Sequence, residues 1–224
     1  MNAATESSLI DAVSTQQPTR VARIGDQAEV LGEIYQPECN LAVWQRDLEH
    51  EIEHYMTQLT ESNRQVNLRC LIGTGEEMRE EITAQLSRAL PNFASTVGDG
   101  KEALINNICE LVEMYQCLFE PEQIGVRLAT LQRAMCPKFH VDLLPARMVT
   151  CFSGAGTQWL PEPENGEQRI PEIEPDRFEQ ISTGDVALLK GDGWFENEGF
   201  GVVHRSPPVA EGETRMFLSL DFTD

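Results

Sequence analysis

The sequence predicts an α+β protein in which a helical N-terminal region packs on a C-terminal antiparallel barrel or sandwich. Two observations predict this class. Apolar residues recur at helical spacing between Leu41 and Phe119. Beyond Met135, glycine and proline become frequent and short β-rich runs appear. We therefore expect three parts: a flexible N-terminal arm over residues 1–28, a mainly helical region over 29–134 and a β-rich region over 135–224.

Four helices are expected before residue 136. The first is predicted by apolar residues that share one helical face, namely Leu41, Trp44, Leu48, Ile52, Tyr55 and Leu59. A second covers 78–90 and is stopped by Pro91. A third covers 104–119. The segment PEQIGVRLATLQRAM, 121–135, is expected to be a fourth, with Pro121 in its first turn.

Four strands are expected after residue 135. They are the runs RMVTCF, DVALLK, FGVVHR and MFLSLDF, which are separated by turn residues. The acidic, proline-rich stretch LPEPENGEQRIPEIEPD is expected to be an exposed excursion between strands or a mobile lid.

The composition argues against several classes of partner. The formal net charge is −20, whereas nucleic acids and anionic membranes need a basic footprint. No apolar run approaches the ~20 residues of a membrane span. The six cysteines are dispersed without a C-x-x-C pair, and the first twenty residues lack a secretory pattern. We expect free thiols, a cytoplasmic location, and no nucleic-acid or membrane partner.

The run HEIEH at residues 50–54 matches H-E-x-x-H, the pattern in which two histidines one helical turn apart bind zinc in peptidases. At about 100° per residue, His50 and His54 lie roughly opposite the apolar face of the first expected helix. In a zinc peptidase they would face the interior, where a third ligand converges. We therefore expect two solvated histidines on an acidic helix.

The other two histidines, His140 and His204, lie in the β-rich half. Asp142 follows His140 at i+2, so in an extended segment the imidazole and the carboxylate project from the same face. With His204 they form the donor set of the facial triad, which binds Fe(II) and leaves positions open. H-x-D alone is a weak signal. The alternatives are hydrogen-bonded core histidines, with Asp142 capping a turn.

Three stretches give this motif a wider context: HVDLLPARMVTCFSGAGTQWL, ISTGDVALLKG and HRSPPVAEGETRMFLSLDF. In order and spacing they resemble the catalytic core of the Fe(II)/2-oxoglutarate dioxygenases, especially the prolyl-hydroxylase-like branch. The matching positions are His140, Asp142, Arg147, Thr150, Gly154, Gly156, Thr157, Gly184, Asp185, His204, Pro208, Gly212 and Arg215.

The resemblance implies that residues 135–224 form a double-stranded β-helix of the jelly-roll or cupin type. It further implies a non-haem Fe(II)- and 2-oxoglutarate-dependent oxygenase acting on an unknown small-molecule or protein substrate. The catalytic metal ligands would be His140, Asp142 and His204, and Arg215 would pair bidentately with the distal carboxylate of 2-oxoglutarate.

The chain departs from the dioxygenase pattern beside the cosubstrate. Many members carry a hydroxyl two residues after the basic residue, where this chain has Phe217. Ser219, which shares the face of Arg215, and Thr150 are the residues expected to replace it. Arg205 is an unusual charge next to the distal histidine. Asp185 is expected to be a turn residue, and Arg147 is as well suited to pairing with surface acids as to touching a substrate.

A closer resemblance, carried by MCPKFHVD, GAGTQWL, DVALLKG and HRSPP, is to a bacterial family known only as a domain of unknown function and often encoded near zinc-homeostasis genes. Zinc is therefore the alternative metal, and Cys136 would favour it if its thiol reached the site. An inert buried thiol is the other interpretation of Cys136. Two other functions stay open: a zinc-binding protein without turnover, and an inactive jelly-roll that binds a ligand or a protein.

Overall fold

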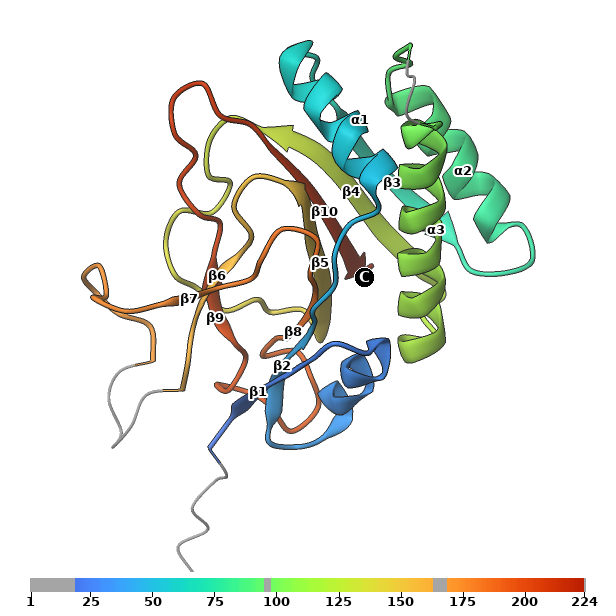
Figure 1. Ribbon diagram of the computed structural model, residues 1–224. Coiled ribbons are helices and arrows are strands. Elements are labelled where there is room, and N and C mark those ends of the chain that lie inside the picture. Colours follow the sequence, from blue (N-terminus) through green and yellow to red (C-terminus); the bar gives the residue numbers. More distant parts are fainter. Residues whose placement is uncertain (1–18, 95–97, 163–168, 224) are drawn as a thin grey trace, which may run out of the picture.

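The computed structural model describes residues 19–94, 98–162 and 169–223. Helices and strands alternate along the first half of the chain, and the second half is built from strands and loops (Figure 1). The helical elements are η1 (Ala28–Tyr35, a 3-10 helix), α1 (His50–Glu61), α2 (Met78–Ala89) and α3 (Gly100–Phe119). The strands are β1 (Val21–Gly25), β2 (Cys39–Trp44), β3 (Asn67–Gly73), β4 (Gln123–Leu131), β5 (Ala146–Ser153), β6 (Gln158–Leu160), β7 (Glu179–Gln180), β8 (Val186–Lys190), β9 (Val203–Arg205) and β10 (Arg215–Phe222).

The strands form two sheets. The large sheet has seven strands in the order β1-β2-β8-β5-β10-β4-β3, and the small sheet has three in the order β7-β6-β9. All neighbours pair antiparallel except β1 and β2. In Figure 1 the helices α1, α2 and α3 lie on one side of the large sheet and the small sheet lies on the other.

The large sheet therefore separates two hydrophobic cores, because successive strand residues point to opposite faces. On β5, Met148 and Phe152 belong to the core under the helices, whereas Val149 and Cys151 belong to the core between the sheets. On β10, Leu218 faces the helices and Phe217 faces the small sheet. We call these two sides the helix face and the barrel face.

Several elements agree with the sequence patterns. The second and third predicted helices are α2 and α3, and α2 ends just before Pro91 because proline cannot continue a helix. The four predicted strands are found as β5, β8, β9 and β10. The predicted α+β class is confirmed as a mixed structure with a large sheet.

The prediction of a mainly helical N-terminal region is not confirmed. Residues 41–44 and 123–131 were both predicted to be helical, but they belong to the strands β2 and β4, and β3 lies between these strands in the sequence. In β4 the buried residues Ile124, Val126 and Leu128 alternate with period two, which is the strand pattern. The helix with HEIEH begins only at His50. The expected N-terminal arm is also shorter, since residues 21–25 form β1; residues 1–18 lie outside the described part.

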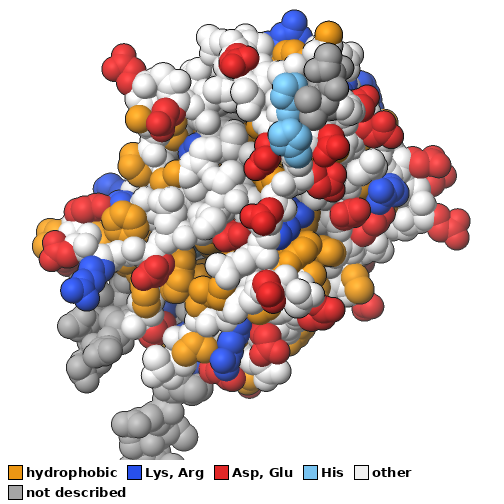
Figure 2. All heavy atoms as spheres, in the orientation of Figure 1, with side chains coloured by type: hydrophobic (Ala, Val, Ile, Leu, Met, Phe, Trp, Pro, Cys, Tyr) orange, Lys and Arg blue, Asp and Glu red, His pale blue; other side chains and the backbone are white. Residues whose placement is uncertain are grey.

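Acidic side chains are spread over the face shown in Figure 2, where they outnumber the basic ones. This distribution agrees with 37 acidic and 17 basic residues in the chain. None of the helices in the described part of the chain is long and apolar enough to cross a membrane.

Candidate metal centre

His140 and His204 are brought together by the backbone. They form an antiparallel bridge in which each amide donates to the other's carbonyl oxygen, with N···O distances of 3.0 and 2.9 Å. Side chains of such a directly opposed pair lie next to each other. The two imidazole ring centroids are 4.6 Å apart. The small sheet thus presents both histidines to the barrel interior.

In both rings a hydrogen bond involves Nδ1 and leaves Nε2 without a partner of this kind. His140 Nδ1 lies 2.9 Å from Lys138 O, and His204 Nδ1 lies 3.1 Å from Val202 O. Since a carbonyl oxygen can only accept, each Nδ1 carries the proton and each Nε2 of the neutral ring has a free lone pair. Such a fixed tautomer is typical of histidine metal ligands.

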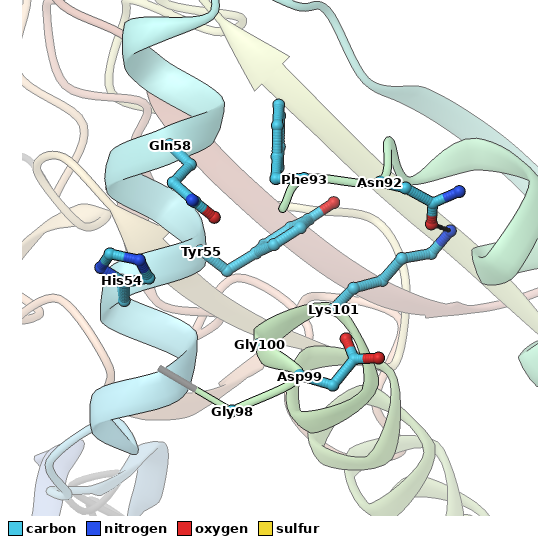
Figure 3. A pocket seen from close by; sticks show the side chains of 9 residues that line it. All are labelled: His54, Tyr55, Gln58, Asn92, Phe93, Gly98, Asp99, Gly100 and Lys101. Carbon is cyan, nitrogen blue, oxygen red and sulfur yellow. Dashed lines mark hydrogen bonds between the residues drawn. The ribbon is translucent and has the colours of Figure 1, made fainter. Parts of the chain in front are cut away.

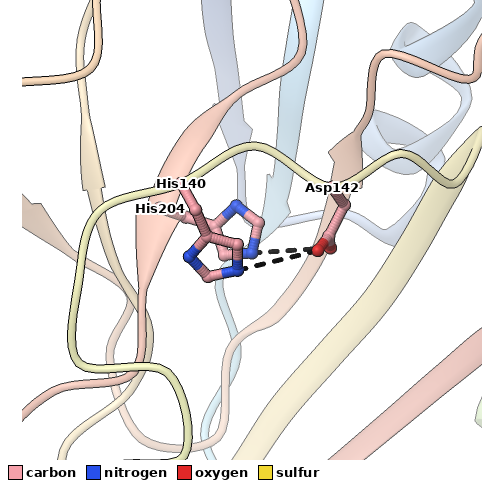
Figure 4. Close-up of side chains that lie close together, drawn as sticks. All are labelled: His140, Asp142 and His204. Carbon is pink, nitrogen blue, oxygen red and sulfur yellow. Dashed lines mark ion pairs between the residues drawn. The ribbon is translucent and has the colours of Figure 1, made fainter.

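Both Nε2 atoms face the Asp142 carboxylate (Figure 4). Their distances to it are 3.7 Å for His140 and 3.5 Å for His204, longer than a normal hydrogen bond. One ligand atom from each residue lies within 4.8 Å of the others. Among the described residues no other group of three or more histidine, cysteine or acidic side chains gathers in this way. Converging lone pairs and a carboxylate without a proton between them fit a divalent cation.

Asp142 is fixed by an arginine and by a close backbone approach. Arg147 Nη1 donates to Asp142 Oδ2 at 2.7 Å, and Arg147 Nε donates to Asp221. The Asp142 carbonyl oxygen accepts from Asp192 N at 2.8 Å. A Cβ on Gly191 would lie 2.1 Å from Leu144 O, so only glycine fits where this loop passes β8. Nothing in the sequence singled out Gly191.

Burial keeps the distal histidine neutral. His204 is 6% exposed, and burial lowers its pKa to about 4, although the nearby Asp142 carboxylate acts in the opposite direction. A neutral imidazole is the form that binds a metal. A small cavity of about 40 Å³ adjoins the two histidines and is lined on its other side by Thr157, Ser206 and Phe217.

Arg215 is buried behind Ser206, a residue that lines this cavity. It is 2% exposed, and its Nη1 donates to Ser206 Oγ at 2.8 Å, while its Nε and Nη2 contact Ala155 O at 2.5 Å and Cys151 Sγ at 3.1 Å. Within the described part of the chain it has no acidic partner. Gly154, with φ +75°, makes room for it, because a Cβ there would lie 2.7 Å from Arg215 Cγ. A buried guanidinium without a carboxylate is a costly arrangement that an acidic ligand would relieve.

The two hydroxyls expected near Arg215 lie elsewhere. Thr150 is on the helix face, between Met148 and Phe152, and its Oγ1 is buried without a hydrogen-bond partner. Ser219 is on the barrel face but four residues along β10, where its Oγ lies 3.4 Å from Asp221 Oδ2. The structure thus does not bring Thr150 or Ser219 to Arg215. The hydroxyl beside it belongs to Ser206, which the sequence analysis missed because the contact depends on how the chain turns between the end of β9 and the start of β10.

Cys136 and Arg205 both line the small cavity beside the two histidines, but neither belongs to the group of ligand atoms around Asp142. Cys136 is exposed. Arg205 is held by other residues. Its guanidinium pairs with Glu174, bonds Gln158 and stacks on Phe139, with 4.3 Å from Cζ to the ring centroid. The charge beside the distal histidine therefore ties the small sheet to the 169–178 segment; residues 163–168 of the expected lid lie outside the described part.

Asp185 is a turn residue, as expected. Its Oδ2 accepts from Ser182 N and its Oδ1 from Arg46 N, both at 3.2 Å. These bonds close the turn before β8.

The HEIEH histidines lie on the helix side. His50 is exposed and lies 3.7 Å from Glu53, its nearest acidic partner. His54 lines a pocket of about 440 Å³ between α1 and the start of α3 (Figure 3). The polar groups there have structural partners: Tyr55 OH donates to Pro91 O, and Lys101 Nζ donates to Asn92. His50 is thus solvated as expected, whereas His54 is half-buried beside this pocket.

A set of arginines on the barrel face was not foreseen. Arg69, Arg127 and Arg147 line a cleft of about 660 Å³ next to the triad. They come from β3, β4 and β5, and no local motif connects them.

Solved structures of other proteins have a fold similar to this one. It is similar to the crystal structure of a dioxygenase for auxin oxidation from rice, with 12% identity, a TM-score of 0.54 and coverage of 91% of this chain and 82% of that one. It is also similar to dioxygenase for auxin oxidation 1 from Arabidopsis thaliana in a binary complex with 2-oxoglutarate, with 10% identity, a TM-score of 0.51 and coverage of 91% and 92%. The fold is therefore that of the dioxygenases.

The sequence itself assigns the family. The model of the protein family of unknown function DUF1826 matches residues 25–221, and the chain belongs to that family. No curated protein matches the sequence. The resemblance to a family of unknown function is thus confirmed, and the resemblance to the dioxygenases is confirmed as a similarity of fold.

Proposed function

We propose that this chain is a non-haem Fe(II)- and 2-oxoglutarate-dependent oxygenase, with His140, Asp142 and His204 as the ligands of the metal. The observation that carries the proposal is the convergence of two Nε2 lone pairs on one carboxylate, with both Nδ1 protons held by carbonyl oxygens. Two imidazoles and one carboxylate suit Fe(II) and leave coordination positions open. Zinc gains no support, because the thiol of Cys136 lies outside the group.

Arg215 is the proposed partner of the distal carboxylate of 2-oxoglutarate. Its guanidinium is buried, has only neutral partners in the described part, and touches Ser206 on the wall of the cavity that also contains His140 and His204. Ser206 Oγ is placed to donate to the same carboxylate. Pairing a bidentate carboxylate with this guanidinium would neutralise the buried charge.

When bound, the ferrous ion and 2-oxoglutarate would supply the activation of dioxygen. The residues of the chain hold the centre ready for them. The carbonyl oxygens of Lys138 and Val202 fix the two imidazole rings. Arg147 holds the Asp142 carboxylate. Val149 and Phe217 contribute apolar side chains to the cavity lining. An apolar lining of this kind would help to keep water from reactive species.

The test is an anaerobic titration of the Fe(II)-loaded protein with 2-oxoglutarate, followed by the visible charge-transfer band of a keto acid chelated to iron. The expected result is a saturable band that is lost in His204→Ala. A parent protein that takes up Fe(II) but never gives the band would show that the chain is not this kind of oxygenase.

A further inference from the structure

The cleft with the three arginines adjoins the candidate metal centre. It lies on the barrel face of β3, β4 and β10, and four of its lining residues, Met135, Cys136, Arg147 and Phe217, also line the cavity beside His140 and His204. A molecule in the cleft would therefore lie next to the metal centre. Ser219 and Gly125 form part of its floor.

Strand register gathers unneutralised positive charge in this cleft. Arg69 on β3 is directly opposite Arg127 on β4, and Arg127 is opposite Ser219 on β10. Like charges directly opposite in neighbouring strands are destabilising. The third arginine, Arg147, is already paired with Asp142 and Asp221.

Among the described residues, neither Arg69 nor Arg127 forms an ion pair of this kind, although Asp221 also lines the cleft and its charge raises the pKa of Arg127 in part. Neither guanidinium forms an ion pair or hydrogen bond with another residue in the part of the chain that the structure describes. Arg127 Nε is buried and has no acceptor. Burial, followed by the charge of Arg69, lowers the pKa of Arg127. Because Asp142 and Asp221 are paired with Arg147, the cleft keeps excess positive charge at Arg69 and Arg127, in a chain with 37 acidic and only 17 basic residues. Such an excess favours an anion as the ligand.

We propose that Arg69 and Arg127 bind the anionic group, a carboxylate or a phosphate, of the oxygenase's primary substrate and so hold that substrate beside the metal centre. This inference rests on the proposed function. The cosubstrate is assigned to a different place. Arg127 is opposite Ser219 on β10, and Arg215 lies four residues away from Ser219, about 13 Å along the same strand. The two sites share Arg147 and Phe217. The substrate would lie on one side of these two residues and 2-oxoglutarate on the other.

The experiment is calorimetric titration of the full chain, without iron or 2-oxoglutarate and at constant low ionic strength, with inorganic phosphate and separately with citrate. We expect at least one of the two anions to bind, at one site per chain. Binding of phosphate alone would identify the anionic group of the substrate as a phosphate, and binding of citrate alone would identify it as a carboxylate. Arg127→Gln and Arg69→Gln should each weaken binding about tenfold to 100-fold, since each removes charge-assisted hydrogen bonds. Arg88→Gln on α2, whose Nε bonds Ala84 O on the other side of the sheet, is the matched control and should bind like the parent.

Removal of either arginine should also leave the melting temperature unchanged or higher without anions, because the opposed charges no longer repel. This readout shows that the variants fold. If Arg127→Gln does not fold, Arg69→Gln, whose side chain is exposed, carries the test. The proposal is overturned if neither probe binds the parent, or if the cleft variants bind as tightly as Arg88→Gln.

The titration of the Fe(II) protein with 2-oxoglutarate separates this inference from the proposed function. If Arg127→Gln loses 2-oxoglutarate and Arg215→Ala keeps it, the cleft is the cosubstrate site and the substrate assignment is wrong. If the parent never binds 2-oxoglutarate but both cleft variants lose phosphate or citrate, the anion site stands and the oxygenase assignment fails.

Discussion

The two faces of the large sheet differ in how their buried polar groups are used. On the helix face, Tyr55 and Tyr115 donate their hydroxyls to backbone carbonyls, and a continuous apolar core surrounds them. On the barrel face, Arg215 and Arg127 form no ion pair within the described residues, and two histidines turn lone pairs toward Asp142. Apart from the Thr150 hydroxyl, which has no partner on the helix face, polar groups that satisfy one another stabilise the fold, whereas groups that leave charge or lone pairs over indicate a ligand.

The two pairs of histidines, one on each side of the sheet, differ in a similar way. HEIEH has the more specific motif, yet its histidines lie on one helix near solvent and no third ligand approaches them in the described structure. His140 and His204 belong to distant segments, and their rings meet only because the backbone bridge opposes them. Convergence from different elements, with each Nδ1 held by a carbonyl, is a stronger sign of a metal site than spacing in one helix.

Metal content gives the sharpest contrast between the faces. His140→Ala and His204→Ala should abolish Fe(II) binding, because loss of a ligand should exceed the ~10–100-fold effect of losing a residue that only orients one. The double replacement His50→Ala with His54→Ala should bind iron like the parent. Elemental analysis of protein purified without oxygen checks both. Loss of metal from the helix variant would reverse the assignment of the two faces.

The next effect concerns Arg215 on the barrel face. Arg215→Ala should weaken 2-oxoglutarate binding at least ~100-fold, because charge-assisted hydrogen bonds contribute about 1.5–3 kcal/mol each. Iron binding should hardly change, since no ligand is lost. Arg215→Lys should recover part of the affinity, because it restores the charge but not the bidentate geometry. Anaerobic titration measures all three, and a parent-like Arg215→Ala would place the cosubstrate elsewhere.

Thr150 tests the helix face with a smaller effect. Thr150→Val should raise the free energy of unfolding by about 1 kcal/mol, because it removes a buried hydroxyl without a partner and keeps the side-chain shape. The matched control is Thr130→Val, which should lower stability by a similar amount, since Thr130 Oγ1 accepts from Val66 N at 2.9 Å. Urea unfolding measures both. A weakened 2-oxoglutarate titration in Thr150→Val would return this hydroxyl to the cosubstrate site.

The smallest effect is expected at the rim of the barrel. Cys136→Ser should change iron affinity by no more than about threefold, because two imidazoles and a carboxylate suffice without a soft ligand. Competition with a chelator gives the affinity. If zinc binds the parent tightly and Cys136→Ser lowers that affinity by two orders of magnitude, the zinc interpretation would replace iron.

Part of the site could be predicted because its signals are local. The i, i+2 spacing of His140 and Asp142 fixes a shared direction in extended backbone. The order of this motif, His204 and Arg215 along the chain predicts the dioxygenase fold from the sequence alone. The same holds for α2 and α3, whose apolar residues follow the helical period over twelve and twenty residues.

Tertiary structure decided the rest, because it depends on which strands become neighbours. By itself the sequence predicted the convergence of His140, Asp142 and His204 and the β-rich second half, and the structure has both. It did not determine that 39–44 and 123–131 are strands, since short apolar runs fit both periods until a sheet edge offers hydrogen-bond partners. The face of Thr150, the contact of Ser206 with Arg215 and the opposition of Arg69 and Arg127 follow from strand register, and a register shift of one residue would reverse each of them.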